Sequence, residues 1–302
     1  MKKSEWTLES LLTKALPALL LCMGSWGLTS CDSNGLTEGD PNYFTSSRGQ
    51  FTATLDNGTT LYLLPGAIAG TAILTYDGDN PRHWQSETTA TVNVTTYSGA
   101  FTLPETLTAN GKSYTLTAIG EEAMMGCRNL ISLTLPETIQ ELGEGAFAIC
   151  TSLTSLNIPE GITEIPTGCF GYCTKLNQLT LPSTIETLGK MAFYGCSGMT
   201  AITLPENLKT IGEMAFFDCS KLTEITIPAS VTTIGNLAFG GRSATDRSKI
   251  EAYHMQSSTP PILEGTLYQT QEGIEPVIYV PAGAVSAYQS APGWSELTIE
   301  EE

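Results

Sequence analysis

Five cysteines recur at a constant spacing of 23 residues, and cysteine thiolates are strong ligands for metals such as zinc. They are Cys127, Cys150, Cys173, Cys196 and Cys219, and Cys169 is a sixth in the same region. If each repeat forms one coil, equivalent cysteines stack about 4.8 Å apart in a line, which is not a tetrahedral metal cage. We therefore predict buried, unpaired thiols and no metal site. The alternative is a disulfide between neighbouring coils, because the stacked spacing falls within the Cα range of disulfides and export would permit one.

The chain offers few other groups for catalysis. Its two histidines, His83 and His254, are separated by the whole repeat region, and it contains no G-x-S-x-G, P-loop or H-E-x-x-H sequence. The adjacent acids Glu121 and Glu122 fall in an expected turn, where we expect solvated carboxylates. A weak calcium site within residues 77–80 is an alternative use of acids, although the twelve-position calcium loop is missing. The residues thus predict no enzyme activity, no metal and no cofactor.

Lipidation of Cys31 is the chemistry with the clearest local signal. Residues 1–30 carry Lys2 and Lys3, followed by an apolar run too short to span a bilayer, as in a secretory signal. The sequence Leu-Thr-Ser-Cys at residues 28–31 looks like a bacterial lipobox, in which the cysteine is acylated after cleavage. An ordinary signal peptide that leaves a free thiol at Cys31 is the alternative. We expect a mature chain that contacts the membrane through its lipid anchor only.

The charge of the chain limits its partners. The formal net charge is −17, and no basic stripe interrupts the acidic surface, so we expect no nucleic acid partner. The segment that follows the signal is polar, acidic and rich in turn residues, which suits an extended tether. A protein or glycan at the cell surface is the partner class that remains.

The repeat indicates how the remaining side chains are positioned. Each copy contains L-x-x-L-x-L-P, and its prolines are Pro136, Pro159, Pro182, Pro205 and Pro228. The alternation of leucines predicts a strand with one buried face, which the proline ends because proline has no N–H for the ladder. The stretch I-x-x-I-G-x-x-A-F then turns the corner and returns along the opposite side of the coil.

The phrase I-G-x-x-A-F-x-x-C-x-x-L-x-x-I-x-L-P recurs about five times and resembles the BspA-like leucine-rich repeat family of bacterial surface proteins. The resemblance covers residues 92–302 well and residues 48–91 less well. It implies display at the cell surface and adhesion to host proteins or other cells.

We predict a β-rich (α+β) solenoid, a right-handed leucine-rich repeat array of 23-residue coils. It has a β cap at the N-terminus and a strand-helix-strand cap at the C-terminus, because an end coil would otherwise expose its apolar cross-section. The expected divisions are a lipoprotein signal peptide (1–30), a lipidated tether (31–47), an N-terminal β cap (48–100), the leucine-rich repeat solenoid (101–260) and a C-terminal cap (261–302).

The contact residues are expected on two kinds of surface. Outward strand positions such as Gln178 and Thr180 are small and polar, while Leu179 between them is expected to face the core. They form either a surface that resists sticking or a shallow hydrogen-bonding platform. The loops supply larger anchors, namely Arg82, Trp84, Arg242, Arg247 and Lys249. Because anchors dominate affinity, we expect a partner to contact these loops and to use the strands for shape.

These features predict a lipid-anchored binding protein of the outer membrane, exposed at the cell surface and engaged in adhesion. The alternative is an accessory glycan-binding lipoprotein of a nutrient-uptake system. An enzyme would need a reaction centre in residues 48–91, where the sequence offers none.

Overall fold

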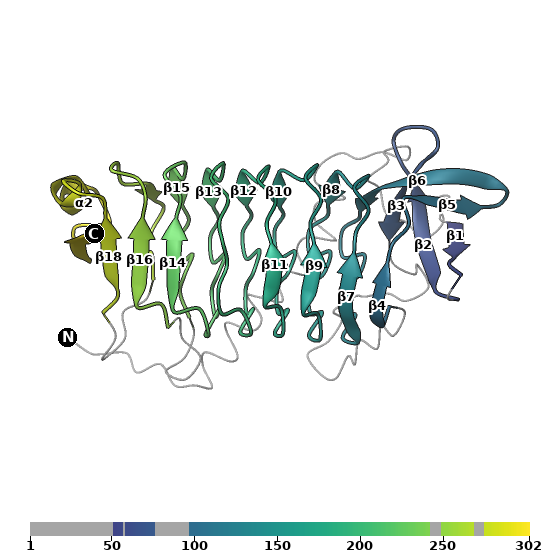
Figure 1. Cartoon of the computed structure of the whole chain (residues 1–302), viewed down its shortest axis with the longest axis horizontal. Helices are drawn as coiled ribbons and strands as arrows, with labels where there is room; N and C mark the ends of the chain where they lie inside the picture. Colours follow the sequence, from purple (N-terminus) through teal and green to yellow (C-terminus); the bar gives the residue numbers. More distant parts are fainter. Residues whose placement is uncertain (1–50, 57, 76–96, 242–248, 269–274) are drawn as a thin grey trace, which may run out of the picture. The chain divides into compact units, whose positions relative to one another are not determined.

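A computed structural model of the chain describes residues 51–56, 58–75, 97–241, 249–268 and 275–302 (Figure 1). These residues belong to one compact unit, formed by residues 51–76 and 93–302. Within the described ranges the unit is rich in β-structure, and its only helix is α2 (Val285–Ser290). The predicted β-rich repeat fold is therefore present.

The first sheet joins N-terminal hairpins to the first coil. Its strands are β1 (Phe51–Thr54), β2 (Thr60–Pro65), β3 (Thr71–Thr75), β5 (Thr106–Ala109), β6 (Lys112–Ile119) and β8 (Glu141–Leu142). Antiparallel pairing links β1 to β2, β2 to β3 and β5 to β6, whereas β6 pairs in parallel with both β3 and β8. Leu61, Leu63 and Leu74 are fully buried under this sheet. The parallel pair of β6 and β8 is the point where the coil pattern begins.

Parallel strands then form a ladder along each of two sides of the coils (Figure 1). One side carries β4 (Gly99–Thr102), β7 (Leu130–Thr134), β9 (Ser155–Asn157) and β11 (Gln178–Thr180), and further along β14 (Glu224–Ile227), β16 (Ala252–Met255), β18 (Val277–Val280) and β19 (Thr298–Glu301). The return side carries β10 (Glu164–Ile165), β12 (Thr187–Leu188), β13 (Thr210–Ile211), β15 (Thr233–Ile234) and β17 (Ile262–Leu263). Leu133 pairs with Leu156 and Leu156 with Leu179, so each coil is one 23-residue repeat.

Aromatic rings stack along the interior. Phe147, Phe170, Phe193, Phe216 and Phe239 are buried, and successive ring centroids lie between 5.2 and 5.5 Å apart with nearly parallel planes. Their backbone N–H groups donate to carbonyl oxygens of the next coil, as from Phe170 to Ala192 at 2.9 Å. The turn that contains these phenylalanines forms no strand, but its backbone is also hydrogen-bonded from one coil to the next.

The six cysteines of residues 127–219 are buried and free, as predicted. Four of them donate an Sγ–H hydrogen bond to a carbonyl oxygen of the preceding coil, as from Cys173 to Phe147 at 3.1 Å. Burial raises the pKa of the Cys173 thiol well above its ordinary value. These thiols act as small apolar groups that also satisfy buried carbonyls, which explains why one residue type recurs at this position.

The corner glycines allow neighbouring coils to approach closely. A β-carbon added to Gly212 would lie 2.6 Å from the carbonyl carbon of Gly189 and 2.7 Å from the backbone nitrogen of Lys190. Both of these atoms belong to the backbone, so neither can move aside as the end of a flexible side chain could. Glycine is therefore required here by the spacing of the backbones.

The last elements of the chain pack around two aromatic residues. Trp294 is fully buried and donates from Nε1 to the carbonyl of Pro261 at 2.8 Å, and Tyr288 of α2 donates to the carbonyl of Ser257 at 2.9 Å. The two rings meet edge to face at 5.0 Å. These contacts attach α2 and β19 to the final coils.

We predict that burying a charge in strand β7 unfolds the protein, whereas the same charge one residue further along is tolerated. Leu133 is 2% exposed and Thr134 is exposed, so Leu133→Asp should lower the free energy of unfolding by several kcal/mol and Thr134→Asp by less than about 1 kcal/mol. Urea denaturation followed by circular dichroism measures both values. Equal losses would contradict the register.

We also predict that Gly212→Ala lowers the free energy of unfolding by about 2 kcal/mol, because the added methyl forces two backbones apart. Thr210→Ala, in the strand before it, serves as the control and should cost less than about 1 kcal/mol. A Gly212→Ala variant as stable as the control in the same denaturation experiment would show that the coils can separate at little cost.

Candidate functional site

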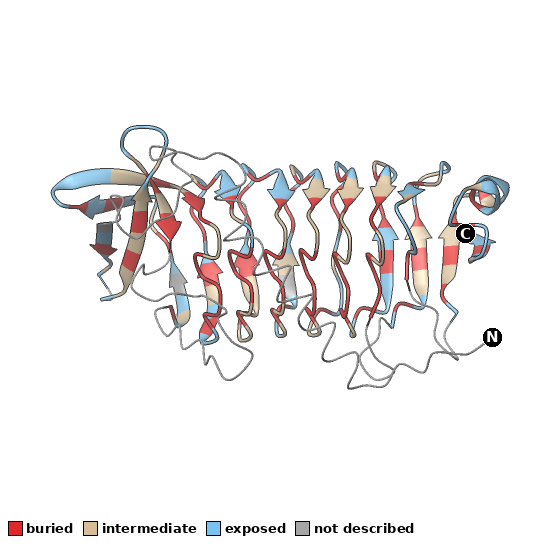
Figure 2. Ribbon diagram, turned by 180° about the vertical axis from the view of Figure 1, so that it is seen from behind, coloured by how far each residue is buried: buried red, intermediate tan, exposed pale blue. Residues whose placement is uncertain are grey.

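The outward positions of β4, β7, β9, β11, β14, β16, β18 and β19 form a surface that we call the strand face. Burial alternates along the strands, as in β14, where Ile225 and Ile227 are buried and Glu224 and Thr226 are exposed (Figure 2). Thr134 and Thr180 are exposed in the same way. The predicted inward and outward columns are confirmed for these strands.

The strand face is interrupted in its middle. Residues 199–204 form no strand, so β11 is the last strand of one sheet and β14 the first of the next. Leu179 is half-buried there, and so is Ile202 in the next coil. The prediction that Leu179 faces the core is therefore only partly correct, because the sheet that would cover its strand ends at this point.

The other sequence-predicted contact residues are placed as follows. Gln178 lies in the same strand, β11, as the exposed Thr180. Lys249 is exposed and directly precedes the buried Ile250. Cys31, Arg82, Trp84, Arg242 and Arg247 lie outside the described residues. The structure thus brings together Gln178 and Thr180 and leaves the loop anchors as a prediction.

One outward side chain is engaged by the fold itself. The amide of Asn157 in β9 accepts from the backbone N–H of Leu135 at 2.8 Å and donates to the carbonyl of Leu135 at 3.0 Å. The backbone N–H and C=O of Leu135, directly after the end of β7, are thus both hydrogen-bonded to a side chain of the next coil. Asn157 is a linker between coils and offers little to a partner.

The C-terminal strands add two rings that the sequence interpretation missed. His254 of β16 pairs in register with Thr226 on one side and with Tyr279 of β18 on the other, so both rings stand on the strand face. The rings stack with centroids 5.2 Å apart, and Nδ1 of His254 lies 3.0 Å from Oε1 of Glu302. The alternation of residue types in Tyr253-His254-Met255 could have revealed the outward histidine, but the five inserted residues before this strand break the 23-residue count.

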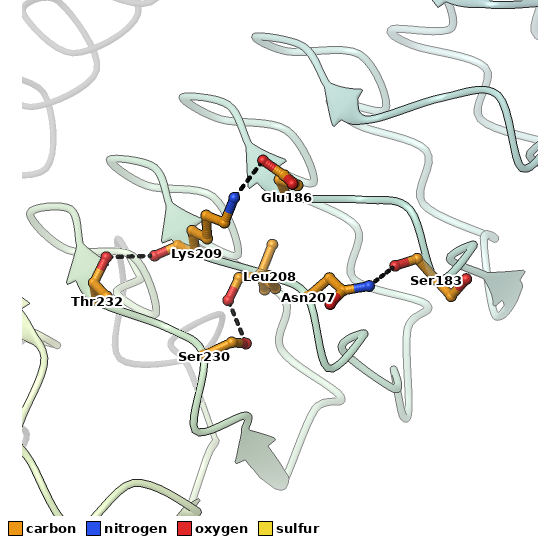
Figure 3. A network of polar contacts seen from close by, with 7 residues as sticks. All are labelled: Ser183, Glu186, Asn207, Leu208, Lys209, Ser230 and Thr232. Carbon is orange, nitrogen blue, oxygen red and sulfur yellow. Dashed lines mark hydrogen bonds and ion pairs between the residues drawn. The ribbon is translucent and has the colours of Figure 1, made fainter.

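The opposite side has a different character, because its polar groups bind neighbouring coils. Figure 3 shows Asn207 donating to the carbonyl of Ser183, Ser230 donating to the carbonyl of Leu208, and the ammonium of Lys209 2.7 Å from a carboxylate oxygen of Glu186. These contacts link successive coils. By contrast, Thr134, Thr180, Thr203 and Thr226 have no side-chain hydrogen bond within the described ranges. Thr187 and Thr210 of the return strands also have none there, so outward hydroxyls without a side-chain hydrogen bond occur on both sides of the coils.

Carboxylates stack at the first corner of the array. Burial raises the pKa of Glu121 from its ordinary value of 4.5 to about 7, and repulsion by Glu122 and Glu144 acts in the same direction. Burial and the charge of Glu164 likewise raise the pKa of Glu144. The expectation of a solvated Glu121 is met only in part: the side chain is half-buried, which is the main cause of its raised pKa, and the neighbouring carboxylates of Glu122 and Glu144 add to it.

The described ranges contain neither a candidate metal site nor a candidate membrane span. No group of three or more histidine, cysteine, aspartate or glutamate residues there is arranged to hold a metal ion. No helix among these residues is both long enough and apolar enough to cross a bilayer.

Comparison with known proteins identifies the repeat. A model of the BspA type leucine rich repeat region matches residues 100–251 in six copies. No curated protein matches the chain. The family model thus covers the coils from β4 to β15 and ends before β16.

Solved structures of leucine-rich repeat proteins resemble the chain. The one from T. pallidum is 19% identical, with a TM-score of 0.50, and the match covers 86% of this chain and 98% of that one. The one from Bacteroides ovatus is 18% identical, with a TM-score of 0.46, over 80% of this chain and 75% of that one. A leucine rich cell surface protein from Faecalibacterium prausnitzii is 17% identical, with a TM-score of 0.28, over 83% and 94%. The likeness to the T. pallidum protein supports the fold alone.

The raised pKa of Glu121 predicts a pH-dependent stability. The folded state binds the proton more tightly than the unfolded state, so stability present below pH 4.5 is lost as the pH rises towards 7. Glu121→Gln, which cannot ionise, should raise the free energy of unfolding by about 1 kcal/mol at pH 8, allowing for solvent screening, and change it little at pH 4. Thermal melts at both pH values test this, with the exposed Glu137→Gln as control. An equal effect of Glu121→Gln at both pH values would contradict the repulsion.

Proposed function

The chain belongs to the BspA-type leucine-rich repeat family, and we propose that it is a binding protein of the bacterial cell surface that adheres to host proteins or to other cells. It acts by binding and not by catalysis. The repeat array holds the ligand, and a lipid on Cys31 holds the array at the outer membrane.

The strand face is the observation that carries this proposal. Its strands are hydrogen-bonded to one another in parallel, so their outward side chains have fixed positions before a partner arrives. Thr134 and Thr180 are exposed and leave their hydroxyls to solvent, whereas several polar side chains of the return side, such as Asn207 and Ser230, bind neighbouring coils. A preorganised surface with available polar groups favours binding, because little conformational entropy is lost.

The array's handedness and its ends complete the proposal. We assign a right-handed coil direction, with β18, α2 and β19 as the C-terminal cap and the hairpins of β1 to β3 as the N-terminal cap. A cap is physically required, because an end coil would otherwise expose its apolar cross-section and an unpaired strand edge.

Glycan capture for a nutrient-uptake system is the second candidate. The row of outward threonines, including Thr180, Thr203 and Thr226, supports it because hydroxyls can exchange hydrogen bonds with an extended sugar chain. The two candidate functions share the same fold and the same lipid anchor, and they differ only in the ligand that is bound.

We predict that Cys31→Ser moves the protein from the membrane to the soluble fraction. No apolar run of about 20 residues follows position 31, so no other segment could replace the lipid. Detergent-phase partitioning of the two proteins measures this, and Cys22→Ser is the control because Cys22 follows Leu21 and not a small residue. A Cys31→Ser protein that stays in the detergent phase would contradict lipidation.

We predict that blocking the strand face abolishes adhesion. Thr180→Trp with Thr203→Trp places two indoles on this face, and Thr187→Trp with Thr210→Trp places the same two on the return side. Binding of each protein to immobilised matrix proteins and to polysaccharides should fall at least tenfold for the first pair only. The immobilised class that retains the unmodified protein separates adhesion from glycan capture.

If neither tryptophan pair changes binding, the strand face is not the site, and the loops that carry Arg82, Trp84, Arg242, Arg247 and Lys249 become the surface to mutate. If the unmodified chain binds neither class of ligand, the proposed function is wrong.

A further inference from the structure

The four C-terminal strands present a small surface of a distinct composition. By register, Glu224, Ala252, Val277 and Thr298 form one column, and Thr226, His254, Tyr279 and Glu300 form the next. We call these eight residues the C-terminal patch. All are exposed or half-buried, while the residues between the two columns are buried. The patch therefore faces outward as a continuation of the strand face.

The centre of the patch is apolar and has fixed positions. Ala252 and Val277 are half-buried neighbours, and the stacked rings of His254 and Tyr279 stand beside them. The contact between His254 and Glu302 fixes the histidine ring, and the stack fixes the tyrosine. The earlier part of the strand face has no comparable pair of rings: its outward positions carry small residues such as Ser132, Ser155 and Ala201, and its exposed Ile131 lies at the start of β7.

Carboxylates occupy opposite corners of the patch. Glu224 lies at the start of the first column and Glu300 at the end of the second, and both are exposed. Neither lysine nor arginine belongs to the patch, and residues 249–302 contain eight glutamates and a single lysine, Lys249. A partner of opposite charge is therefore favoured at this end of the array.

Arginine and lysine side chains combine the two properties that the patch offers to contact. Their methylene stems pack on apolar surface while their charged heads reach carboxylates. A tyrosine ring adds a favourable surface for a cation.

We propose that the C-terminal patch binds a basic segment of a protein partner, with cationic heads at Glu224 and Glu300 and stems on Ala252 and Val277. This inference rests on the proposed surface-binding function. The strands of Glu224 and Glu300 are three spacings apart, or about 14 Å, and the two residues are offset by two positions along the strands, so they lie about 16 Å apart. An extended chain covers about 13 Å in four residues, and two long basic side chains reach across the remainder. Two basic residues four positions apart therefore match both carboxylates.

The test uses a fluorescent peptide with arginines at its second and sixth positions, separated by glycine and serine, and the same peptide with citrulline in place of arginine. Fluorescence anisotropy with the full chain should show binding of the arginine peptide that weakens as salt is added. Glu224→Gln with Glu300→Gln should weaken it at least fivefold, and Tyr279→Ala should weaken it by a similar factor.

The matched control is Glu141→Gln with Glu164→Gln, which removes the same charge from exposed positions of the other ladder. It should change the affinity less than twofold. Equal binding of the two peptides, equal effects of the patch and control variants, or no binding of the arginine peptide would each overturn the proposal. Unchanged thermal melts of the variants exclude loss of the fold as the cause.

The same variants separate this inference from the proposed function. If the patch variants adhere to matrix proteins as well as the unmodified chain does, the patch is not the contact and the adhesion function stands. If the arginine peptide binds at the patch but the chain adheres to nothing, the adhesion function falls and the basic-peptide site stands.

Discussion

The spacing between neighbouring coils is the constraint on which the rest of the structure depends. Parallel backbone pairing fixes that spacing on two sides, and hydrogen bonds such as that from Phe170 to Ala192 fix it at the corner. Every side chain therefore lies on the residue one repeat earlier. Only residue types that can stack on themselves suit the interior, which is why phenylalanine and cysteine form continuous columns. Glycine recurs where two backbones meet at a corner, since any β-carbon would collide there.

The same stacking is unfavourable for equal charges. Glu121 and Glu144 lie in one column, and their repulsion adds to the effect of burial on the pKa of Glu121. Later coils place opposite charges in this position, as in the contact of Lys190 with Glu213 at 2.8 Å. These exposed pairs stabilise the fold by no more than about 1 kcal/mol each, so they avoid repulsion more than they contribute attraction. The array thus tolerates many outward residue types but is sensitive to charge in partly buried columns.

A rigid array has a direct consequence for binding. Outward side chains stand on strands whose positions are set by their neighbours, so a partner meets a surface that is already ordered. Most of that surface is small and polar, and aromatic rings and charge stand together on it at the C-terminal strands, where His254 and Tyr279 introduce rings and Glu224 and Glu300 introduce charge. We expect the large side chains at the C-terminal strands to contribute most of the binding free energy, and the small polar side chains elsewhere to contribute mainly shape complementarity.

The sequence by itself determined the repeat, the alternation that buries Leu133 and exposes Thr134, and the burial of the free thiols, because each follows from a local period of 23 or of 2 residues. Only the tertiary structure decided which residues meet where that period fails. Because of the insertion before Ile250, the 23-residue period no longer indicates that His254 is the neighbour of Thr226. The pairing of β14 with β16 shows that the two residues are neighbours. The half-burial of Leu179 depends on where one sheet ends, and the pKa of Glu121 depends on a carboxylate in another coil. Such contacts are set by backbone hydrogen bonds between coils, whose register a local sequence pattern does not contain once an insertion intervenes.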